Sequence, residues 1–161
     1  MIVDEIEMPD IVKRGTIGPF AVGRILNEIG DGIGTPDYWG FPPGREMNFY
    51  VGYGPLEVYI RADRNAGVLN FIKLKTFKFK RSAFIFRNVY KGEALRVTVT
   101  NTWRTYEGAK SALKRISVKF STEFQEPVKA DTSAVINIEN STRLYFRRHG
   151  EDNILDAVEF S

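Results

Sequence analysis

Two segments of this chain, 86 positions apart, carry the same order of apolar and polar residues. Residues 58–61 align with residues 144–147, and residues 68–74 align with residues 154–160, without a gap and with a turn of equal length between them. Alternating runs joined by a turn predict an antiparallel hairpin in each segment. Similarity at a fixed spacing is the sequence signature of an internal repeat, so this spacing constrains the fold more than any other feature.

Two interpretations of the spacing stay open. In the first, the chain is a tandem repeat, and a shift of 87 positions also places Leu26 on Leu113 and Ile29 on Ile116, within two apolar stripes typical of amphipathic helices. In the second, two unrelated amphipathic hairpins look alike, because only three of the 17 aligned pairs are identical. These pairs are Tyr59/Tyr145, Arg61/Arg147 and Leu69/Leu155.

The rest of the pattern predicts a helix, then strands, then the same order again. We expect the first helix over residues 19–30, a loop rich in proline and glycine over 31–44, and a second helix from Thr105, as its N-cap, to about residue 120. Strands are expected over residues 47–53, 56–60, 68–75, 83–89, 95–101, 134–138, 143–147 and 153–160. A bulge or a bend near Thr76 would turn both Phe77 and Phe79 toward the core.

The predicted fold class is therefore α+β. Two tandem helix-plus-antiparallel-hairpin repeats would form one continuous antiparallel sheet, with the helices packed on one face. The first repeat, with extra strands, would cover residues 1–101 and the second would cover residues 102–161, in one compact unit. A length of 161 residues with 43% hydrophobic content is sufficient for a single core of this kind.

The composition excludes several kinds of chemistry. The chain has no cysteine and one histidine, His149, so it has no thiol nucleophile, no cysteine-based metal site and no multi-histidine centre. The glycine-rich residues 30–34 lack the Lys-Ser/Thr of a phosphate-binding loop. His149 precedes Gly150 in a predicted turn, whereas acid–base catalysis needs a partner in a shaped pocket. We therefore expect no metal, no cofactor and no catalytic residue, in a protein that is not an enzyme.

The hydropathy and the first residues bear on location. No stretch near 18 consecutive apolar residues is present, which predicts no membrane-spanning helix. Residues 1–5 lack the basic region and apolar stretch of a signal peptide. Together with the lack of cysteine, these observations favour a cytoplasmic location.

Charge is distributed unevenly along the chain. Residues 1–50 carry 4 basic and 8 acidic side chains, residues 51–100 carry 10 and 3, and residues 101–161 carry 9 of each, which gives the net charge of +3. The middle third contains a basic band made of Lys73, Lys75, Lys78, Lys80, Arg81 and Arg87. Phenylalanines alternate with it, at positions 71, 77, 79, 84 and 86.

Basic and aromatic side chains on a sheet are used by single-stranded nucleic-acid readers, so a module of that kind is the alternative function. Most of the phenylalanines are expected to point into the core, opposite the lysines, and buried rings cannot stack on bases. This expectation argues against nucleic acid as a partner.

Two motifs lie between residues 20 and 75. Ile33–Tyr38 contains a G-x-P-D loop after the first helix, and Tyr53–Ile60 reads Y-G-x-L-E followed by alternating apolar residues. This order resembles small bacterial immunity proteins, which neutralise polymorphic or contact-dependent toxins. The tandem architecture is also similar to that of a secreted β-lactamase inhibitory protein, although this chain lacks cysteines and a visible signal peptide. Both resemblances imply a non-enzymatic protein that binds and blocks another protein, here a cognate toxin.

The expected binding surface consists of aromatic anchors ringed by charge. The candidate anchors are Tyr38, Trp39 and Phe41, with Tyr50 or Tyr53 beside them. The acidic candidates, which would meet a basic cleft of the toxin, are Asp31, Asp37, Glu46 and Glu57. Two alternatives stay open: the basic band would face an acidic partner, or Tyr38 and Trp39 would only seal the interface between the repeats.

Overall fold

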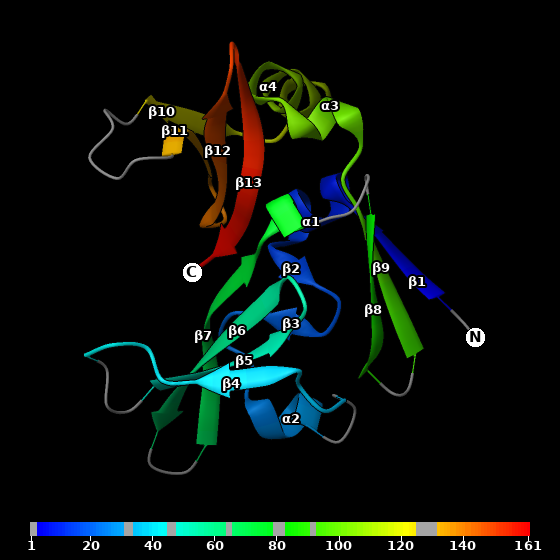
Figure 1. Ribbon diagram of the computed structural model, residues 1–161, viewed down its shortest axis with the longest axis vertical. Coiled ribbons are helices and arrows are strands. Elements are labelled where there is room, and N and C mark those ends of the chain that lie inside the picture. Colours follow the sequence, from blue (N-terminus) through cyan, green and yellow to red (C-terminus); the bar gives the residue numbers. More distant parts are fainter. Residues whose placement is uncertain are drawn as a thin grey trace.

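The computed structural model describes residues 3–30, 34–44, 48–63, 66–78, 83–90, 93–124 and 132–161. In this part of the chain, strands and a few helices combine in an α+β fold, as the sequence predicts (Figure 1). The main element is a sheet of eight strands, which is accompanied by a sheet of three strands and a two-stranded ribbon. Within the described ranges, no helix is both long enough and apolar enough to cross a bilayer.

The eight-stranded sheet is antiparallel throughout and has the strand order β10-β11-β12-β13-β7-β6-β5-β4. It consists of two four-stranded meanders. The first contains β4 (Tyr38–Gly40), β5 (Asn48–Tyr53), β6 (Leu56–Asp63) and β7 (Ala66–Leu74). The second contains β10 (Phe120–Phe124), β11 (Thr132–Ile138), β12 (Thr142–His149) and β13 (Asp152–Phe160). The meanders join edge to edge through β7 and β13.

The two hairpins at the centre of the sheet have the same register at positions 86 apart. The ladder of β6 and β7 is interrupted between Tyr59 and Ile60, and the ladder of β12 and β13 is interrupted between Tyr145 and Phe146. The flanking pairs are Tyr59↔Phe71 and Ile60↔Leu69 in the first hairpin, and Tyr145↔Ala157 and Phe146↔Leu155 in the second. Because a bulge bends a strand and increases its twist, both hairpins carry the same local distortion at the same place.

The helices that precede the meanders start at equivalent places but differ in length. Each of α2 (Leu26–Gly30) and α4 (Tyr106–Arg115) begins directly after a bridge to the last strand of its meander. The two bridges are Ile25↔Val68 and Thr105↔Ile154. The helix starts are thus 106 − 26 = 80 positions apart, and the predicted alignment of the helices at 87 positions is wrong.

The hydrophobic core lies on one face of the eight-stranded sheet. Alternate residues of β6, namely Leu56, Val58 and Ile60, are fully buried in it. Side chains from α1 (Met8–Arg14), α2, α3 (Asn101–Arg104) and α4 belong to the same cluster. All four helices therefore pack on this face. We call the opposite face of the eight-stranded sheet, which points away from the core, the outer face.

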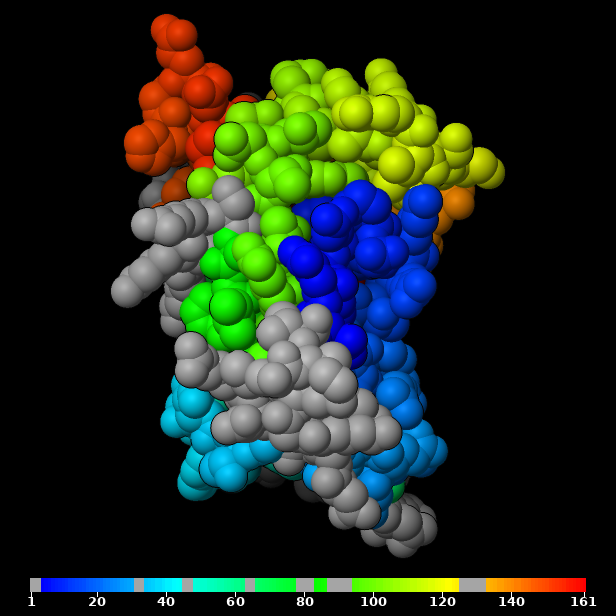
Figure 2. Space-filling model, turned by 90° about the vertical axis from the view of Figure 1, so that its right-hand side faces the viewer, coloured from blue at the N-terminus to red at the C-terminus, as the bar shows by residue number. Residues whose placement is uncertain are grey.

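A three-stranded sheet covers part of the same core. The N-terminal strand β1 (Val3–Glu7) pairs in parallel with β9 (Glu93–Thr98), and β8 (Ala83–Tyr90) completes this sheet. Figure 2 shows β1 in dark blue against the yellow-green of β9. The two-stranded ribbon of β2 (Thr16–Ile17) and β3 (Phe20–Ala21) follows α1. Parallel pairing of distant segments has no turn signal in the sequence, which is why β1 was not predicted.

Two predicted helix boundaries and one predicted loop are wrong. Residues 19–30 are not one helix, because β3 lies within them and Gly23 adopts a left-handed φ of 89°. The predicted loop over 31–44 contains β4. The second helix is capped as predicted, since the Thr105 hydroxyl accepts a hydrogen bond from the Gly108 N–H at 3.2 Å. It ends at Arg115 and not near residue 120, where β10 begins.

Of the bulge or bend expected near Thr76, the structure has no bulge but a short 3-10 helix, η1 (Thr76–Lys78), directly after β7 and Lys75. Phe77 does not enter the core as expected, because its exposed fraction is 55%. Phe79 lies outside the described residues. The predicted strand over 95–101 ends at Thr98, and α3 starts at Asn101.

Candidate protein-binding surface

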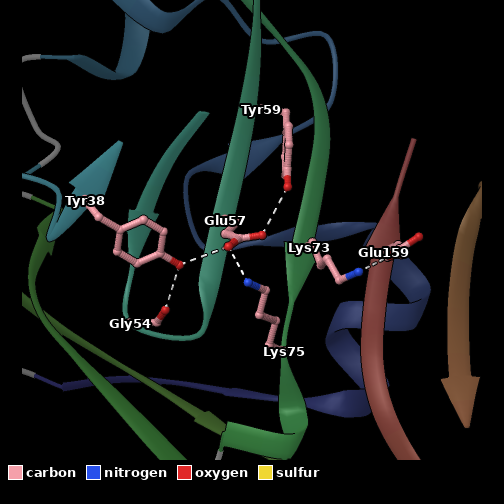
Figure 3. Close-up of polar contacts among 7 residues, drawn as sticks. All are labelled: Tyr38, Gly54, Glu57, Tyr59, Lys73, Lys75 and Glu159. Carbon is pink, nitrogen blue, oxygen red and sulfur yellow. Dashed lines mark hydrogen bonds and ion pairs between the residues drawn. The ribbon is translucent and has the colours of Figure 1, made fainter. Parts of the chain in front are cut away.

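The outer face carries a row of side chains that crosses all eight strands. Strand register places Glu57 opposite Lys73, and Lys73 opposite Glu159 (Figure 3). The complete row runs Tyr38, Gly52, Glu57, Lys73, Glu159, Arg143, Asn137 and Ser121. Because directly opposed side chains on one face of a sheet are close enough to interact, the row connects the two meanders.

Glu57 is the centre of a hydrogen-bond network on the first meander. It is 6% exposed, and its carboxylate forms an ion pair with Lys75 and accepts hydrogen bonds from the hydroxyls of Tyr38 and Tyr59, each at 3.1 Å. The Tyr38 hydroxyl also lies 3.1 Å from the carbonyl oxygen of Gly54. This carboxylate is therefore already bonded within the chain, which weighs against the prediction that it meets a basic toxin cleft.

The network fixes the charge state of its members. Burial raises the pKa of Glu57, but the hydrogen bond and charge of Lys75, with the two hydroxyls, outweigh burial and hold that pKa below its ordinary value. Burial, followed by the negative charge of Glu57, raises the pKa of Tyr59 to about 12 and also moves the pKa of Tyr38 well above its ordinary value. Glu57 is thus ionised at neutral pH, and both hydroxyls remain donors.

Four aromatic rings, including those of Tyr38 and Tyr59 from this network, form a ladder on the outer face. Neighbouring ring centroids are 6.3 Å apart for Tyr38 and Tyr50, 5.2 Å for Tyr50 and Tyr59, and 5.2 Å for Tyr59 and Phe71. The rings are tilted or edge-on to one another, the geometries that aromatic pairs prefer, and all four residues are half-buried. The first meander therefore presents a packed aromatic surface on the outer face.

Two glycines make room for this ladder. A Cβ atom at Gly52 would lie 2.1 Å from Cζ of Tyr38, and a Cβ atom at Gly40 would lie 2.9 Å from the hydroxyl oxygen of Tyr50. Both distances are shorter than a normal contact between heavy atoms. Each ring thus lies directly over a glycine on the neighbouring strand.

The second meander adds a further polar group to the outer face. Glu159 Oε1 lies 2.9 Å from Lys73 Nζ, across the pairing of β7 with β13. Burial raises the pKa of Tyr145, the hydrogen bond with Arg143 lowers it in part, and Glu159 raises it. Side chains of both meanders are therefore in electrostatic contact at the centre of the sheet.

The exposed aromatic pair consists of Trp39 on the edge strand β4 and Phe41, which directly follows this strand. Each is 67% exposed, and their ring centroids are 5.7 Å apart at an interplanar angle of 88°. β4 is the last strand in the sheet order, so within the described residues one side of its backbone has no strand neighbour. Trp39 belongs to the core side of the sheet by register, but β4 lies at the periphery, where no core covers the ring.

The structure separates the predicted site residues into three groups. Tyr38 and Tyr50 lie on the outer face with Glu57, whereas Trp39 and Phe41 form the exposed pair. Neither Tyr38 nor Trp39 seals an interface between the meanders, because that interface is β7 with β13 and β4 lies at the far edge of the sheet.

Two other candidates have structural roles. Tyr53 is buried in the core, where it packs on Phe20 at 5.9 Å and donates a hydrogen bond to the carbonyl of Gly34 at 3.0 Å. Asp37 accepts a hydrogen bond from the Gly54 N–H at 2.6 Å and so holds the turn between β5 and β6. The remaining acidic candidates, Asp31 and Glu46, lie outside the described residues.

Part of the basic band can be placed as well. Lys73 and Lys75 are ion-paired with Glu159 and Glu57. Lys80 and Arg81, with the side chains of Lys78 and Arg87, lie outside the described residues. The expectation that most phenylalanines oppose the lysines holds for Phe86, which is buried, but not for Phe71, which shares the outer face with Lys73.

Sequence reasoning did not single out Tyr59 and Glu159 as members of a surface. A signal was available, because residues two apart in a strand share a face. In the hairpin, Glu57 and Tyr59 on one strand therefore lie opposite Lys73 and Phe71 on the next. The junction of β7 with β13 has no such local signal, because the two strands are far apart in the sequence.

The described residues contain no group of three His, Asp or Glu side chains that could hold a metal ion. His149 lies at the exposed tip of the β12–β13 hairpin, as the sequence predicts. No protein-family model matches the chain, and neither curated proteins nor solved structures give a match.

Proposed function

We propose that this chain is a non-enzymatic immunity protein that binds a cognate bacterial toxin and blocks it. The observation that carries the proposal is the pair Trp39, on the edge strand β4, and Phe41, directly after this strand, which are both 67% exposed. Large exposed aromatic residues that contact each other are typical of interface hot spots. Tryptophan contributes more than most residues in such positions, because it buries a large area at a low entropic cost.

The surroundings of this pair support a preformed interface. Tyr38 and Tyr50 lie on the adjacent outer face, where hydrogen bonds and ring contacts hold them in place. A surface that is ordered before binding loses less conformational entropy on association. The free side of β4 adds backbone donors and acceptors, which a strand or loop of the partner can use.

We also propose that the two units of one helix and four strands, residues 25–74 and 105–160, descend from one ancestral unit. The supporting observations are the identical hairpin registers, the identical bulges and the two equivalent bridges before the helices. A duplicated unit of this kind produces a broad continuous sheet, and inhibitors can use such a sheet as a rigid support for binding residues.

A single-stranded nucleic-acid module is the second candidate. The placement of Phe71 beside Lys73 on the outer face favours it, since bases stack on rings flanked by cations. The ion pairs of Lys73 and Lys75 weigh against it, because these ammonium groups already have carboxylate partners.

The experiment is a protection assay in cells that express the product of the adjacent upstream gene as the toxin. We expect the wild-type chain to restore growth, and the double variant Trp39→Ala/Phe41→Ala to lose this protection at equal expression. Phe124→Ala is the matched control, because Phe124 is 72% exposed on the opposite edge strand β10. Absence of protection by the wild type, or salt-dependent retention of the chain on single-stranded oligonucleotides, would contradict the proposal.

A further inference from the structure

The strand β10 forms the edge of the eight-stranded sheet that lies farthest from β4 (Figure 1). Within the described residues, one side of its backbone has no strand neighbour. Four of its five residues are exposed, and the last of them, Phe124, is 72% exposed. Over these five residues the ladder with β11 runs without a register shift, and the strand contains no proline. Because free edges without bulges or prolines are templates for pairing with another chain, β10 is a candidate interaction surface.

The two faces of β10 differ in chemistry. Ser121 belongs to the row on the outer face, opposite Asn137, and Glu123 shares this face because it lies two residues further on. The Asn137 amide donates a hydrogen bond to the Glu123 carboxylate at 2.9 Å. Phe124 is on the core side, where its ring centroid lies 5.6 Å from that of Tyr106 at the start of α4. The edge therefore presents polar groups on one face and an aromatic ring on the other.

The same alternation continues into the two residues before β10. Val118 is packed partly against the core, on the face that also carries Phe124. The Lys119 ammonium group lies 3.7 Å from the carboxylate of Glu139, and both side chains of this ion pair are largely exposed. Such a pair contributes little to stability, and an ammonium group has three donors, so Lys119 can bind a second carboxylate at the same time. Residues 118–124 thus form a seven-residue edge.

A two-fold axis perpendicular to the sheet would pair this edge with the same edge of a second copy. Such an axis keeps the outer faces of both copies on one side, so only registers that oppose two residues of the same face are allowed. The register centred on Ser121 places Lys119 opposite the partner's Glu123, and Val118 opposite the partner's Phe124, each of them twice. Opposite charges and apolar pairs directly across two strands stabilise a sheet. A register centred on Glu123 would instead place two carboxylates face to face.

The surface beside this edge has room for the partner's ring. A hollow of about 820 Å³ is lined by residues of α4 and β10 and of the segment between them, among them Lys114, Val118 and Phe120. The register centred on Ser121 places the partner's Phe124 opposite Val118, which is at this hollow. The exposed ring of each copy would then be removed from water against apolar side chains of the other copy, which favours association.

We propose that two copies of this chain form a symmetric dimer in which β10 pairs antiparallel with the partner's β10, centred on Ser121. Backbone hydrogen bonds along the two free edges hold the copies together, and the side chains select the register. The two eight-stranded sheets become one continuous sheet, and the β4 edges lie at its two ends. The inference is therefore independent of the proposed immunity function, because the toxin-binding edge of each copy is not part of the dimer interface.

Cross-linking of single-cysteine variants tests the register directly, because the chain has no cysteine of its own. Ser121→Cys places each new thiol opposite its equivalent, so mild oxidation is expected to give a disulfide-linked dimer. Thr122→Cys is the matched control, since residue 122 is an exposed neighbour on the same strand. In the proposed register its two copies are offset by two residues along the strands, which is more than the roughly 7 Å between Cα atoms that a disulfide spans. We expect Ser121→Cys to cross-link about tenfold faster than Thr122→Cys.

Sedimentation equilibrium of the full-length protein measures dimerisation without a cross-link. Glu123→Lys replaces both opposite-charge pairs by like-charge pairs and is expected to weaken dimerisation about tenfold. The exchanged pair Lys119→Glu/Glu123→Lys should recover most of this loss. Glu151→Lys makes the same charge change in the exposed turn between β12 and β13 and should dimerise like the wild type.

Four results would overturn the proposal. They are a wild type that stays monomeric at every concentration, equal cross-linking of Ser121→Cys and Thr122→Cys, and dimerisation of Glu123→Lys that equals that of the wild type. The fourth is growth into open polymers, which pairing of β10 with the β4 edge of the next copy would produce. None of these experiments includes the toxin, so their failure would leave the proposed immunity function in place.

Discussion

Lys73 Nζ and Glu159 Oε1 lie 2.9 Å apart at the one pairing that joins the two meanders in the described part of the chain. The two residues occupy equivalent positions, since 73 + 86 = 159. The pairing of β7 with β13 therefore places residue 73 of the first hairpin opposite residue 159, which occupies the same position in the second hairpin. Identical residues there would put like charges face to face, which destabilises a sheet. Opposite charges at the two positions make the pairing of the meanders favourable.

The first prediction concerns this junction. Glu159→Gln removes one charge of a partly buried pair and is expected to reduce the free energy of unfolding by about 1 kcal/mol. Glu159→Lys places two cations opposite each other and should cost more than Glu159→Gln. The exchanged pair Lys73→Glu/Glu159→Lys should recover most of the loss. Urea denaturation gives the free energy of unfolding of the wild type and of the three variants. A double variant that is no more stable than Glu159→Lys would show that these two charges do not stabilise the pairing of β7 with β13.

The second prediction concerns the acid sensitivity of Glu57. Glu57→Gln leaves the ammonium group of Lys75 without its carboxylate and is expected to destabilise the protein by about 2 kcal/mol at pH 7. Because the pKa of Glu57 is lowered in the folded state, its contribution is complete above its ordinary pKa and disappears as the pH falls through the lowered value.

Denaturation curves between pH 7 and pH 3 test this prediction. The difference in unfolding free energy between the wild type and Glu57→Gln should shrink at the acidic end of this range. The matched control is Glu151→Gln, in the exposed turn between β12 and β13, for which a change within about 0.5 kcal/mol is expected. A difference that stays constant over this range would show that folding does not lower the pKa of Glu57.

The third prediction concerns the glycine beneath Tyr38. Gly52→Ala places a methyl group 2.1 Å from the Tyr38 ring, so the ring must move and its hydrogen bond to Glu57 is lost. We expect a loss of about 1 to 3 kcal/mol. Gly30→Ala is the control, because nothing lies within 4 Å of the position that its new methyl group would take, and its stability change should be small. Tyr38→Ala added to Gly52→Ala should restore part of the loss, and no recovery would contradict the proposed clash.

The fourth prediction concerns the cap of α4. Thr105→Ala removes the hydroxyl that accepts from the Gly108 N–H and is expected to cost about 1 kcal/mol. Thr100 holds the same position before α3 but makes no side-chain hydrogen bond as a cap. Thr100→Ala should therefore cost less than half as much as Thr105→Ala. Equal losses of stability in thermal denaturation would mean that the threonine hydroxyl does not determine where α4 starts.

Local sequence patterns predict those parts of the fold that depend on neighbouring residues. The hairpin of β6 and β7 could be predicted from alternation on both sides of a polar turn, and Thr105 could be predicted as a cap. Residues 19–30 show why a local pattern also misleads. Val22, Ile25, Leu26 and Ile29 have helical spacing, yet the backbone of Gly23 and Arg24 bonds to Leu69 and so leaves the helix only its last part.

The candidate surface could be predicted only in part, for a similar reason. Trp39 and Phe41, which the sequence offers as candidate anchors, are exposed in the structure, and their contact with a partner stays a prediction. The roles of Glu57 and Asp37 could not be predicted, because acidic residues in an acidic segment look available until their hydrogen-bond partners are known. The junction of β7 with β13 and the parallel pairing of β1 with β9 depend on contacts between distant segments, which periodicity does not record.

The proposed role of the exposed pair Trp39 and Phe41 is best tested by hydroxyl-radical footprinting of the purified chain with and without the product of the upstream gene. Trp39 and Phe41 are expected to react readily in the free protein and to be protected in the complex. Phe124, exposed on the opposite edge strand, provides the internal control and should react equally in both samples. Protection of Trp39 and Phe41 alone is the result that the account predicts, and unchanged reactivity of these two residues in a stable complex would contradict it.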